Sequence, residues 1–513
     1  MSPYSFSSAN NRVVTAVAFL ILILISITFF FQAIHFDFVN WDDDLYVYNN
    51  VTIRSFDWDN IKTWFTKPFV ALYVPVPLIS YALDYRFFGA DASGFHLTNI
   101  LLHTANTAII FLIFVFIFED CLLSFFAALL FCIHPVQVET VVWISQRKNL
   151  LFAFFLLLGF YVRIRVLGKG KHYDWLILSV ICFVLSLFSK ATAIMIPFML
   201  ICYEYFYRGA GKREGLVVAL FLIVPAIAMG FFTLMLYPDA LQKMNLALFF
   251  KLFLGMMGSF LYYLKLIFYP LSLKLFYSND FQLLSLQWAD ILRILGAVLL
   301  TFLFVYAYFK KKSYGFWLAW FGFFLLPVLN IFPVPIADRH LYVPLAGLLG
   351  ALLCFGRRWR WPIAMLLCAA IVILTPIARA RTLVWQNGET LWKSASDDSG
   401  RTHYRSGMQL AGYYEDQGRW DDAVNLYWEV AKERSPSLPY AFLNLYGILR
   451  QQADQAGMAR LSKLFQRRYT GLYELPAVYE SLLKAKPDPG AVELILRDLV
   501  DASGKSRKRG SLP

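Results

Sequence analysis

The sequence predicts an all-α membrane protein: a polytopic bundle of about eleven transmembrane helices, followed by a small helical domain near the C-terminus. Two observations predict the bundle. Hydrophobic residues make up 59% of the 513 residues and charged residues only 16%, whereas globular proteins carry about 25% charged residues. A soluble chain cannot bury so much apolar surface, because its exterior must remain largely polar. Apolar runs near the ~20-residue length that crosses a bilayer core also recur along most of the chain.

These apolar runs are the individual helices of the predicted bundle. The first, 13–34, is longer than the roughly 7–15 residues of a signal-peptide core, so we expect it to remain as an anchor. The later predicted spans are 95–117, 121–138, 149–166, 175–189, 192–207, 216–236, 291–309, 315–332, 341–356 and 362–379.

Positive charge orients the bundle. The chain carries 47 Lys and Arg against 34 Asp and Glu, a net charge of +13, and basic residues gather in the short connections between spans. Because cytoplasmic loops are enriched in Lys and Arg, we place these connections and the N-terminus in the cytoplasm. The surplus is thus a topology signal and gives no reason to expect nucleic acid as a partner. The basic residues on this side are Arg12, Arg163, Arg165, Lys169, Lys171, Arg208, Lys212, Arg213, Lys310, Lys311, Lys312, Arg357, Arg358 and Arg360.

Two long segments, 35–94 and 237–290, then lie on the outer side. The second contains an apolar stretch, 248–269, whose Lys251 and Lys265 fit an interfacial helix better than a span. The C-terminal domain lies outside as well. Low cysteine use and a short repeat array favour a bacterial inner membrane, with the C-terminal domain in the periplasm.

Residues 382–486 have the composition of a soluble helical domain of tetratricopeptide-repeat (TPR) type. One repeat is convincing and a degraded second unit follows it, whereas a solenoid core normally needs about three repeats. We therefore expect a short helical array, then a short helix and a basic disordered tail over 487–513. The positions that match the repeat are Leu410, Tyr414, Gly418, Ala423, Tyr427, Ala431 and Pro436.

Three consecutive carboxylates, Asp42, Asp43 and Asp44, follow the first apolar run. Adjacent carboxylates beside an apolar helix end do not all keep ordinary pKa values unless a cation, metal or partner compensates them. Such a group supplies what acid–base chemistry needs, or holds a divalent metal through Asp42 and Asp43. The alternative is a solvated acidic turn that prevents the loop from inserting into the membrane.

Cationic residues at the outer ends of several spans form a second candidate group. His134, Glu139, Arg147 and Lys148 lie near the end of the third predicted span, where ionisable groups are costly and usually functional. One interpretation is an anion site for a phosphate, with Arg147 and Lys148 as its cations. The other is ordinary anchoring at the membrane interface.

Lys190 and the pair Arg339–His340 stand beside apolar runs on the same outer side. Taken singly, each is more often a cation that reaches to the interface. Taken together with Arg147 and Lys148, they describe a pocket that faces the acidic cluster and binds an anionic, membrane-embedded ligand.

Several segments give the chain a resemblance to the GT-C glycosyltransferases, and more closely to the transmembrane-and-TPR protein O-mannosyltransferase family. The similarity extends over nearly the whole chain in the same order. The segments that carry it are FVNWDDDLYVYNN (38–50), FHLTNILLHTANT (95–107), HPVQVETVVWISQRKNLL (134–151), the Lys190 segment, LKLIFYPLSLKLFY (264–277), ADRHLYVP (337–344) and RTLVWQNGETLWKSA (381–395).

The resemblance implies a GT-C-like catalytic domain over residues 1–381, whose active site is in outer loop 35–94 and whose donor is a sugar on a lipid phosphate. The acidic pair of the family falls on Asp42 and Asp43, and Asp44 takes a supporting role. The family's His-Pro-x3-Glu motif falls on His134 and Glu139, with Arg147 as the matching cation. The position after Lys148 is Asn149, where relatives commonly carry Asp.

We therefore expect an inverting glycosyltransferase that moves a sugar, with mannose as the first candidate, from a polyprenyl-phosphate donor to a hydroxyl group. Asp42 or Asp43 is the expected base. The donor phosphate is expected at Arg147, Lys148, Lys190, Arg339 and His340. Protein Ser/Thr is the leading acceptor, with the TPR-like domain as the surface for protein partners. The alternatives are a lipid or surface-polysaccharide acceptor, or a membrane scaffold without enzymatic activity.

Overall fold

The chain divides into two units, Met1–Gln386 and Asn387–Pro513, in the computed structural model of the protein. The predicted tail 487–513 and parts of loop 237–290 lie outside the residues that the structure describes. In the described part of the chain the secondary structure is helical, apart from a single bridge between Phe69 and Leu72. The described residues are 9–70, 72–166, 173–208, 214–235, 246–277, 288–310, 312–329, 335–395, 404–432, 438–469 and 479.

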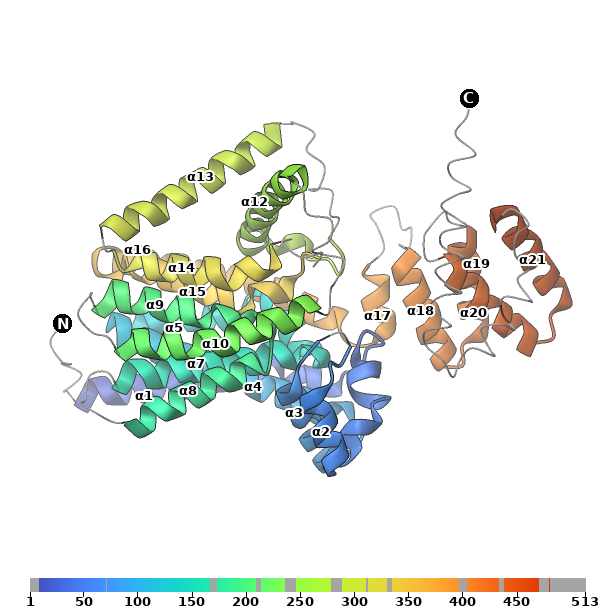
Figure 1. Ribbon diagram of the computed structural model, residues 1–513, viewed down its shortest axis with the longest axis horizontal. Helices are drawn as coiled ribbons and strands as arrows, with labels where there is room; N and C mark the ends of the chain where they lie inside the picture. The colour runs from blue at the N-terminus through green and yellow to red at the C-terminus, as the bar shows by residue number, and fades with distance from the viewer. Residues whose placement is uncertain are drawn as a thin grey trace. The chain divides into compact units, whose positions relative to one another are not determined.

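The first unit is a bundle of long helices, many of them roughly parallel, with α2 and α3 gathered at one end (Figure 1). Each predicted span, and the stretch 248–269, coincides with a helix or a helical pair. The helices are α1 (Ala9–Phe30), α2 (Trp58–Thr66), α3 (Pro75–Phe88), α4 (Ala92–Phe118), α5 (Cys121–Ile133), α6 (Val138–Val142), α7 (Arg147–Val166), α8 (Tyr173–Leu187), α9 (Ile196–Tyr203), α10 (Glu214–Met235), α12 (Leu246–Phe268), α13 (Trp288–Phe309), α14 (Tyr314–Leu325), α15 (Tyr342–Leu353) and α16 (Gly356–Val384).

Three of the described helical stretches are long and apolar enough to cross a membrane by themselves: Asn10–His35, Ala92–Phe118 and Gly356–Val384. A fourth crossing is possible in the pair Cys121–Ile133 and Pro135–Val142, which is bent by 52°. The bend falls where Pro135 follows His134, because proline lacks the amide donor that would continue the preceding helix. The number of eleven crossings and their orientation stay predictions.

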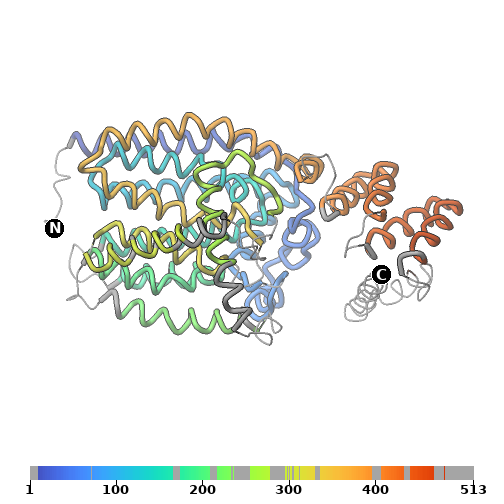
Figure 2. The backbone as a smooth tube through the Cα atoms, turned by 90° about the horizontal axis from the view of Figure 1, so that it is seen from above, coloured from blue at the N-terminus to red at the C-terminus, as the bar shows by residue number. Residues whose placement is uncertain are grey.

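Helix α4 is central to the bundle. Its most apolar window is 67% buried, against 22% for α1 and 28% for α16, and it packs on α1, α5 and α7. Figure 2 shows α1 and α16 together along one edge of the bundle, where the guanidinium of Arg379 lies 4.6 Å from the ring centroid of Phe29. These two edge helices expose apolar side chains, as helices in contact with lipid do.

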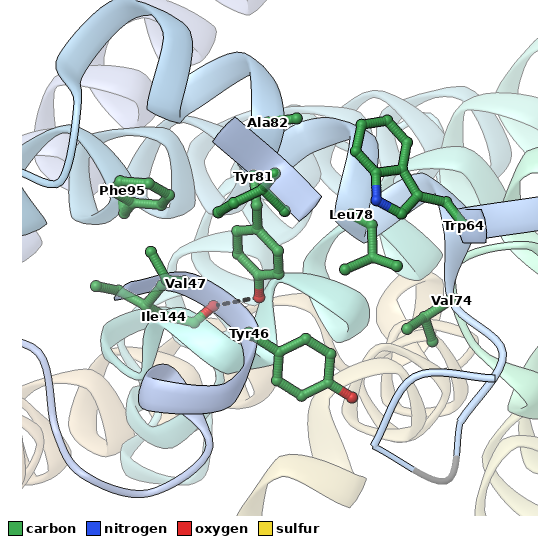
Figure 3. Packing of buried hydrophobic residues seen from close by; sticks show 10 residues of the cluster. Tyr46, Val47, Trp64, Val74, Leu78, Tyr81, Ala82, Phe95 and Ile144 are labelled. Carbon is green, nitrogen blue, oxygen red and sulfur yellow. Dashed lines mark hydrogen bonds between the residues drawn. The ribbon is translucent and has the colours of Figure 1, made fainter. Parts of the chain in front are cut away.

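The segment between α1 and α4 folds around its own apolar core. Tyr46, Trp64, Leu78 and Tyr81 are buried there beside Ile144 from the turn before α7 (Figure 3). The Tyr81 hydroxyl donates a hydrogen bond of 3.0 Å to the Ile144 carbonyl. This core holds the acidic turn against the end of the bundle.

The second unit is a short row of helices in which α18, α19, α20 and α21 pack in chain order. Ala411, Ala423 and Ala431 are fully buried at the crossings, as the repeat spacing requires, and Gly418 turns the chain with φ of 71°. The assignment to the TPR class stays a prediction. The helices are α17 (Gly388–Lys393), α18 (Tyr404–Asp416), α19 (Trp420–Lys432), α20 (Leu438–Gln451) and α21 (Gln455–Tyr469).

Candidate active site

The acidic turn separates the two central aspartates into different environments. Asp42 has a φ of 65°, a left-handed conformation that Asp tolerates better than most residues. The side chain of Asp42 stays 30% exposed, whereas Asp43 is only 1% exposed. Asp44 begins the short π-turn Asp44–Tyr48 and is partly exposed.

Asp43 is an anchor of the turn. Its carboxylate accepts hydrogen bonds from the Ser145 hydroxyl at 2.5 Å, the Ser145 amide at 2.9 Å and the Val39 amide at 3.2 Å. Burial raises the pKa of Asp43 to about 7, although these three donors pull it down. The carboxylate thus ties the turn to the segment before α7, and both of its oxygens are engaged.

Asp42 faces a cation. Its carboxylate lies 4.0 Å from the Lys148 ammonium, and that ammonium lies 4.6 Å from the centroid of the Tyr46 ring. Lys148 is buried, so its charge acts through a medium of lower polarity than water. Asp42 is therefore an accessible carboxylate beside a desolvated positive charge.

A stack of aromatic rings lies next to Asp42. Trp41 stacks on Trp143 at 4.6 Å between ring centroids, and Trp143 on Trp385 at 5.4 Å. The Trp143 indole also donates a hydrogen bond of 2.8 Å to the Trp41 carbonyl. Phe276, from the turn after α12, packs on Trp41 at 5.5 Å. These rings form one wall beside the acidic turn.

The predicted His-Pro-x3-Glu motif forms the bend between α5 and α6. The His134 Nε2 atom hydrogen bonds the Ile267 carbonyl at 3.1 Å, and its Nδ1 atom accepts from the Val136 amide at 3.3 Å. Glu139 binds the Arg339 guanidinium at 2.5 Å and accepts from the Arg339 amide at 3.3 Å. His134 shapes the bend, and Glu139 orients a predicted phosphate ligand.

Lys190, Arg339 and His340 line one cavity with Asn149. It is narrow, with a volume of only about 10 Å³ for a water-sized sphere, and its other lining residues include Phe152. The Lys190 ammonium donates to the Asn149 amide oxygen, while the Asn149 amide nitrogen donates to the Arg339 carbonyl at 3.3 Å. Three of the predicted anion-binding side chains thus meet at one place.

The hydrogen-bond partner of Lys190 is the neutral amide of Asn149. A carboxylate at that position would have neutralised the charge of the lysine. Burial, and the positive charges of Arg339 and Lys148, lower the pKa of Lys190 to about 7, whereas Glu139 raises it. The ε-ammonium therefore lacks a carboxylate at contact distance in the described structure. An anion bound beside Lys190 would supply that charge.

Arg147, predicted as a donor-phosphate ligand, lies in a different cluster. It forms a 2.7 Å ion pair with Asp84. It also donates to Asn99, to the Ser80 hydroxyl at 2.7 Å and to the Phe95 carbonyl at 2.8 Å. The side chain is wholly buried, so its donors are committed to joining α3, α4 and α7. Arg147 therefore has its guanidinium donors engaged within the protein and is not placed to bind the donor phosphate.

Sequence reasoning did not find the partners that give these residues their roles. Ser145, which binds Asp43, and Asp84, which binds Arg147, are separated from them by many residues in the chain. Nothing in the sequence around Ser145 indicates that it contacts Asp43. The sequence shows only that Ser145 lies within the segment 134–151, which carries the resemblance to the family.

The acidic pair does not have the arrangement of a metal site. Asp43 accepts from three N–H and O–H donors, and Asp42 faces Lys148. Across the described residues, no group of three or more His, Cys, Asp or Glu is placed to hold a metal ion. We derive no step through a metal.

The fold and site thus place an accessible carboxylate beside a cluster of cations at one end of a helical bundle that includes membrane-length apolar helices. Comparison with known proteins agrees with the resemblance inferred from the sequence. The chain is similar to protein O-mannosyl-transferases, among them members of the TMTC series.

Protein O-mannosyl-transferase F38B6.6 of Caenorhabditis elegans is 27% identical over an alignment of 448 positions, which covers 80% of this chain and 62% of that protein. Protein O-mannosyl-transferase TMTC3 of Mus musculus is 29% identical over 136 residues, 26% of this chain and 15% of its own length. TMTC4 of Homo sapiens is 28% identical over 144 residues, 24% of this chain and 19% of its own. This chain spans less than two thirds of the length of these relatives. No family model and no solved structure matches it.

Proposed function

We propose that the protein is an inverting glycosyltransferase that uses a polyprenyl-phosphate-linked sugar as its donor, with mannose as the first candidate sugar. The acceptor is a Ser or Thr hydroxyl of a protein on the periplasmic side. The observation that carries the proposal is the accessible Asp42 carboxylate, 4.0 Å from the buried Lys148 ammonium, whose charge in turn acts on Lys190 in the cavity. The names of the similar proteins support the sugar and the acceptor.

Asp42 is the proposed base. It takes the proton of the acceptor hydroxyl as that oxygen forms its bond to the anomeric carbon of the sugar. The bond from the anomeric carbon to the phosphate oxygen breaks at the same time, and the electron pair leaves with the lipid phosphate. A single displacement of this kind inverts the anomeric centre.

Asp43 supports this step without touching the reacting atoms. Its three hydrogen bonds hold the turn in place, and so maintain the left-handed backbone at Asp42. A residue in that conformation costs roughly 1–3 kcal/mol and persists only where its surroundings enforce it. The buried neighbour supplies that enforcement.

Lys148, Lys190 and Arg339 are the proposed ligands of the donor phosphate. Lys190 and Arg339 line the same cavity, and Lys148 approaches from the side of Asp42. Charge that develops on the leaving phosphate is stabilised by cations already held in place, and this effect is strong where water is excluded. His340, whose Nδ1 atom is hydrogen bonded to the Tyr263 hydroxyl at 2.8 Å, also lines the cavity.

The test is a transfer assay with the purified full-length chain in liposomes. Polyprenyl-phosphate-linked mannose is the donor, and a Ser/Thr-rich peptide, a glycolipid and a polysaccharide are the acceptors. The proposal expects mannosylation of the peptide, with the anomeric configuration of the donor inverted in the product by NMR. Transfer only to glycolipid or polysaccharide would overturn the acceptor, and a retained configuration would overturn the mechanism. Absence of transfer from any lipid-linked sugar would overturn the proposed function.

A further inference from the structure

Asp338 and Arg381 belong to two of the segments that resemble the family. Neither residue is the proposed base or a proposed ligand of the donor phosphate. Asp338 is completely buried. Its two carboxylate oxygens bind different parts of the chain: one accepts from the Tyr277 hydroxyl, and the other from the Arg381 guanidinium at 3.3 Å. The carboxylate therefore joins the loop before α15, the turn after α12 and the end of α16.

The same groups close the turn 273–277. Arg381 donates to the Leu273 and Lys274 carbonyls, both at 3.3 Å. The Tyr277 hydroxyl accepts from the Lys274 amide at 3.1 Å while it donates to Asp338. The backbone of the turn is thus held largely by side chains that converge on a single carboxylate.

Two residues that adjoin this network in the sequence, Phe276 and Arg339, contact residues of the proposed site. Phe276, next to Tyr277, packs on Trp41 at 5.5 Å, and Trp41 directly precedes Asp42. On the other side of Asp338, the Arg339 guanidinium binds Glu139 and lies 5.4 Å from the Trp143 ring centroid. A shift of Asp338 would therefore move an aromatic wall and a phosphate ligand together.

We propose that Asp338, bound by Arg381 and Tyr277, is a positioning residue that fixes the turn 273–277 and Arg339 for binding of a lipid phosphate. The inference rests on the proposed function for its ligand. Asp338 itself is buried behind the site and acts through its neighbours. Ordering these groups before the ligand arrives removes an entropic cost from binding.

The conservative substitution Tyr277→Phe tests this role. It leaves the ring and removes the hydroxyl that joins Asp338 to the turn, so one buried carboxylate oxygen loses a donor. Tyr269→Phe is the matched control, because the Tyr269 side chain is 56% exposed and belongs to the same connection after α12. Arg381→Lys is a second variant, since it keeps the charge and loses the planar group that reaches two carbonyls.

Two measurements use the full-length protein in detergent: hydrogen–deuterium exchange of peptides covering 273–277, and binding of undecaprenyl phosphate. Tyr277→Phe and Arg381→Lys should accelerate exchange in the turn and weaken binding about tenfold, while Tyr269→Phe matches the wild type. Unchanged binding in both variants, or weaker binding without faster exchange, would overturn the positioning role. If the wild type binds no lipid phosphate, the proposed function fails instead, and the ligand assigned to this network fails with it.

Discussion

Asp43 is proposed to act by holding the acidic turn that carries Asp42 in place. Asp43→Asn keeps the size of the side chain but places an amide N–H₂ where the carboxylate accepts from the Val39 amide or from Ser145. A buried donor that faces another donor costs roughly 1–3 kcal/mol. We expect Asp43→Asn to lower the melting temperature, measured by thermal unfolding in detergent, and Asp42→Asn to leave it nearly unchanged. Equal melting temperatures for Asp43→Asn and the wild type would contradict the anchoring role.

If Lys190 binds the donor phosphate as proposed, donor affinity should depend on pH. Its pKa is lowered to about 7, and the phosphodiester of a lipid-linked sugar keeps one negative charge throughout this range. Because only protonated Lys190 attracts that charge, affinity should be full below pH 7 and fall as the pH rises through this value. The expected loss is about tenfold between pH 6 and 8, measured by titration with the donor.

Lys190→Arg is the control for this pH effect, since guanidinium stays protonated over the whole range. Its affinity should fall by no more than about twofold between pH 6 and 8. The same decline in wild type and variant would show that another group titrates. The charged groups near Lys190 are Arg339, Lys148 and Glu139.

Arg147 links helices α3, α4 and α7 and does not bind the proposed ligand. Arg147→Lys keeps the charge but cannot reproduce the contacts with Asp84, Asn99, Ser80 and Phe95. Each buried polar group that loses its hydrogen-bond partner costs about 1–3 kcal/mol. The variant should therefore show a clearly lower melting temperature, and the fraction that stays folded should bind the donor with nearly wild-type affinity. A normal melting temperature with a large loss of donor affinity would return Arg147 to the phosphate site.

The contrast between Arg147 and Lys148 also shows where sequence reasoning ended. The apolar runs predicted the helices of the first unit, because their length and composition are local properties. Arg147 and Lys148 are adjacent and equally charged in the sequence, yet one is committed to Asp84 and the other approaches Asp42. That difference depends on which helix faces each residue, and no local pattern contains it.

The same limit applies to the acidic cluster. The sequence indicated Asp42 and Asp43 as a pair, but the left-handed backbone and the contacts from Ser145 separate them into an exposed and a buried carboxylate. The network at Asp338 was not predicted either, because its three members come from regions separated by many residues along the chain.

At the scale of the whole molecule, the +13 net charge has two uses. The basic residues in the predicted cytoplasmic connections are expected to set the orientation of the helices in the membrane, and this orientation stays a prediction. A few cations, Lys148, Lys190 and Arg339, lie at the candidate site, two of them around one cavity. The proposed function therefore depends on a small set of charges at one end of the bundle.

The central claim is that Asp42 is the base. The measurement is the rate of mannose transfer by Asp42→Asn in liposomes, with Asp59→Asn as the control, because Asp59 is an exposed carboxylate of the same outer segment. We expect a loss of at least about 100-fold for Asp42→Asn with an unchanged melting temperature, and a wild-type rate for Asp59→Asn. A folded Asp42→Asn protein that transfers mannose at the wild-type rate would contradict the claim.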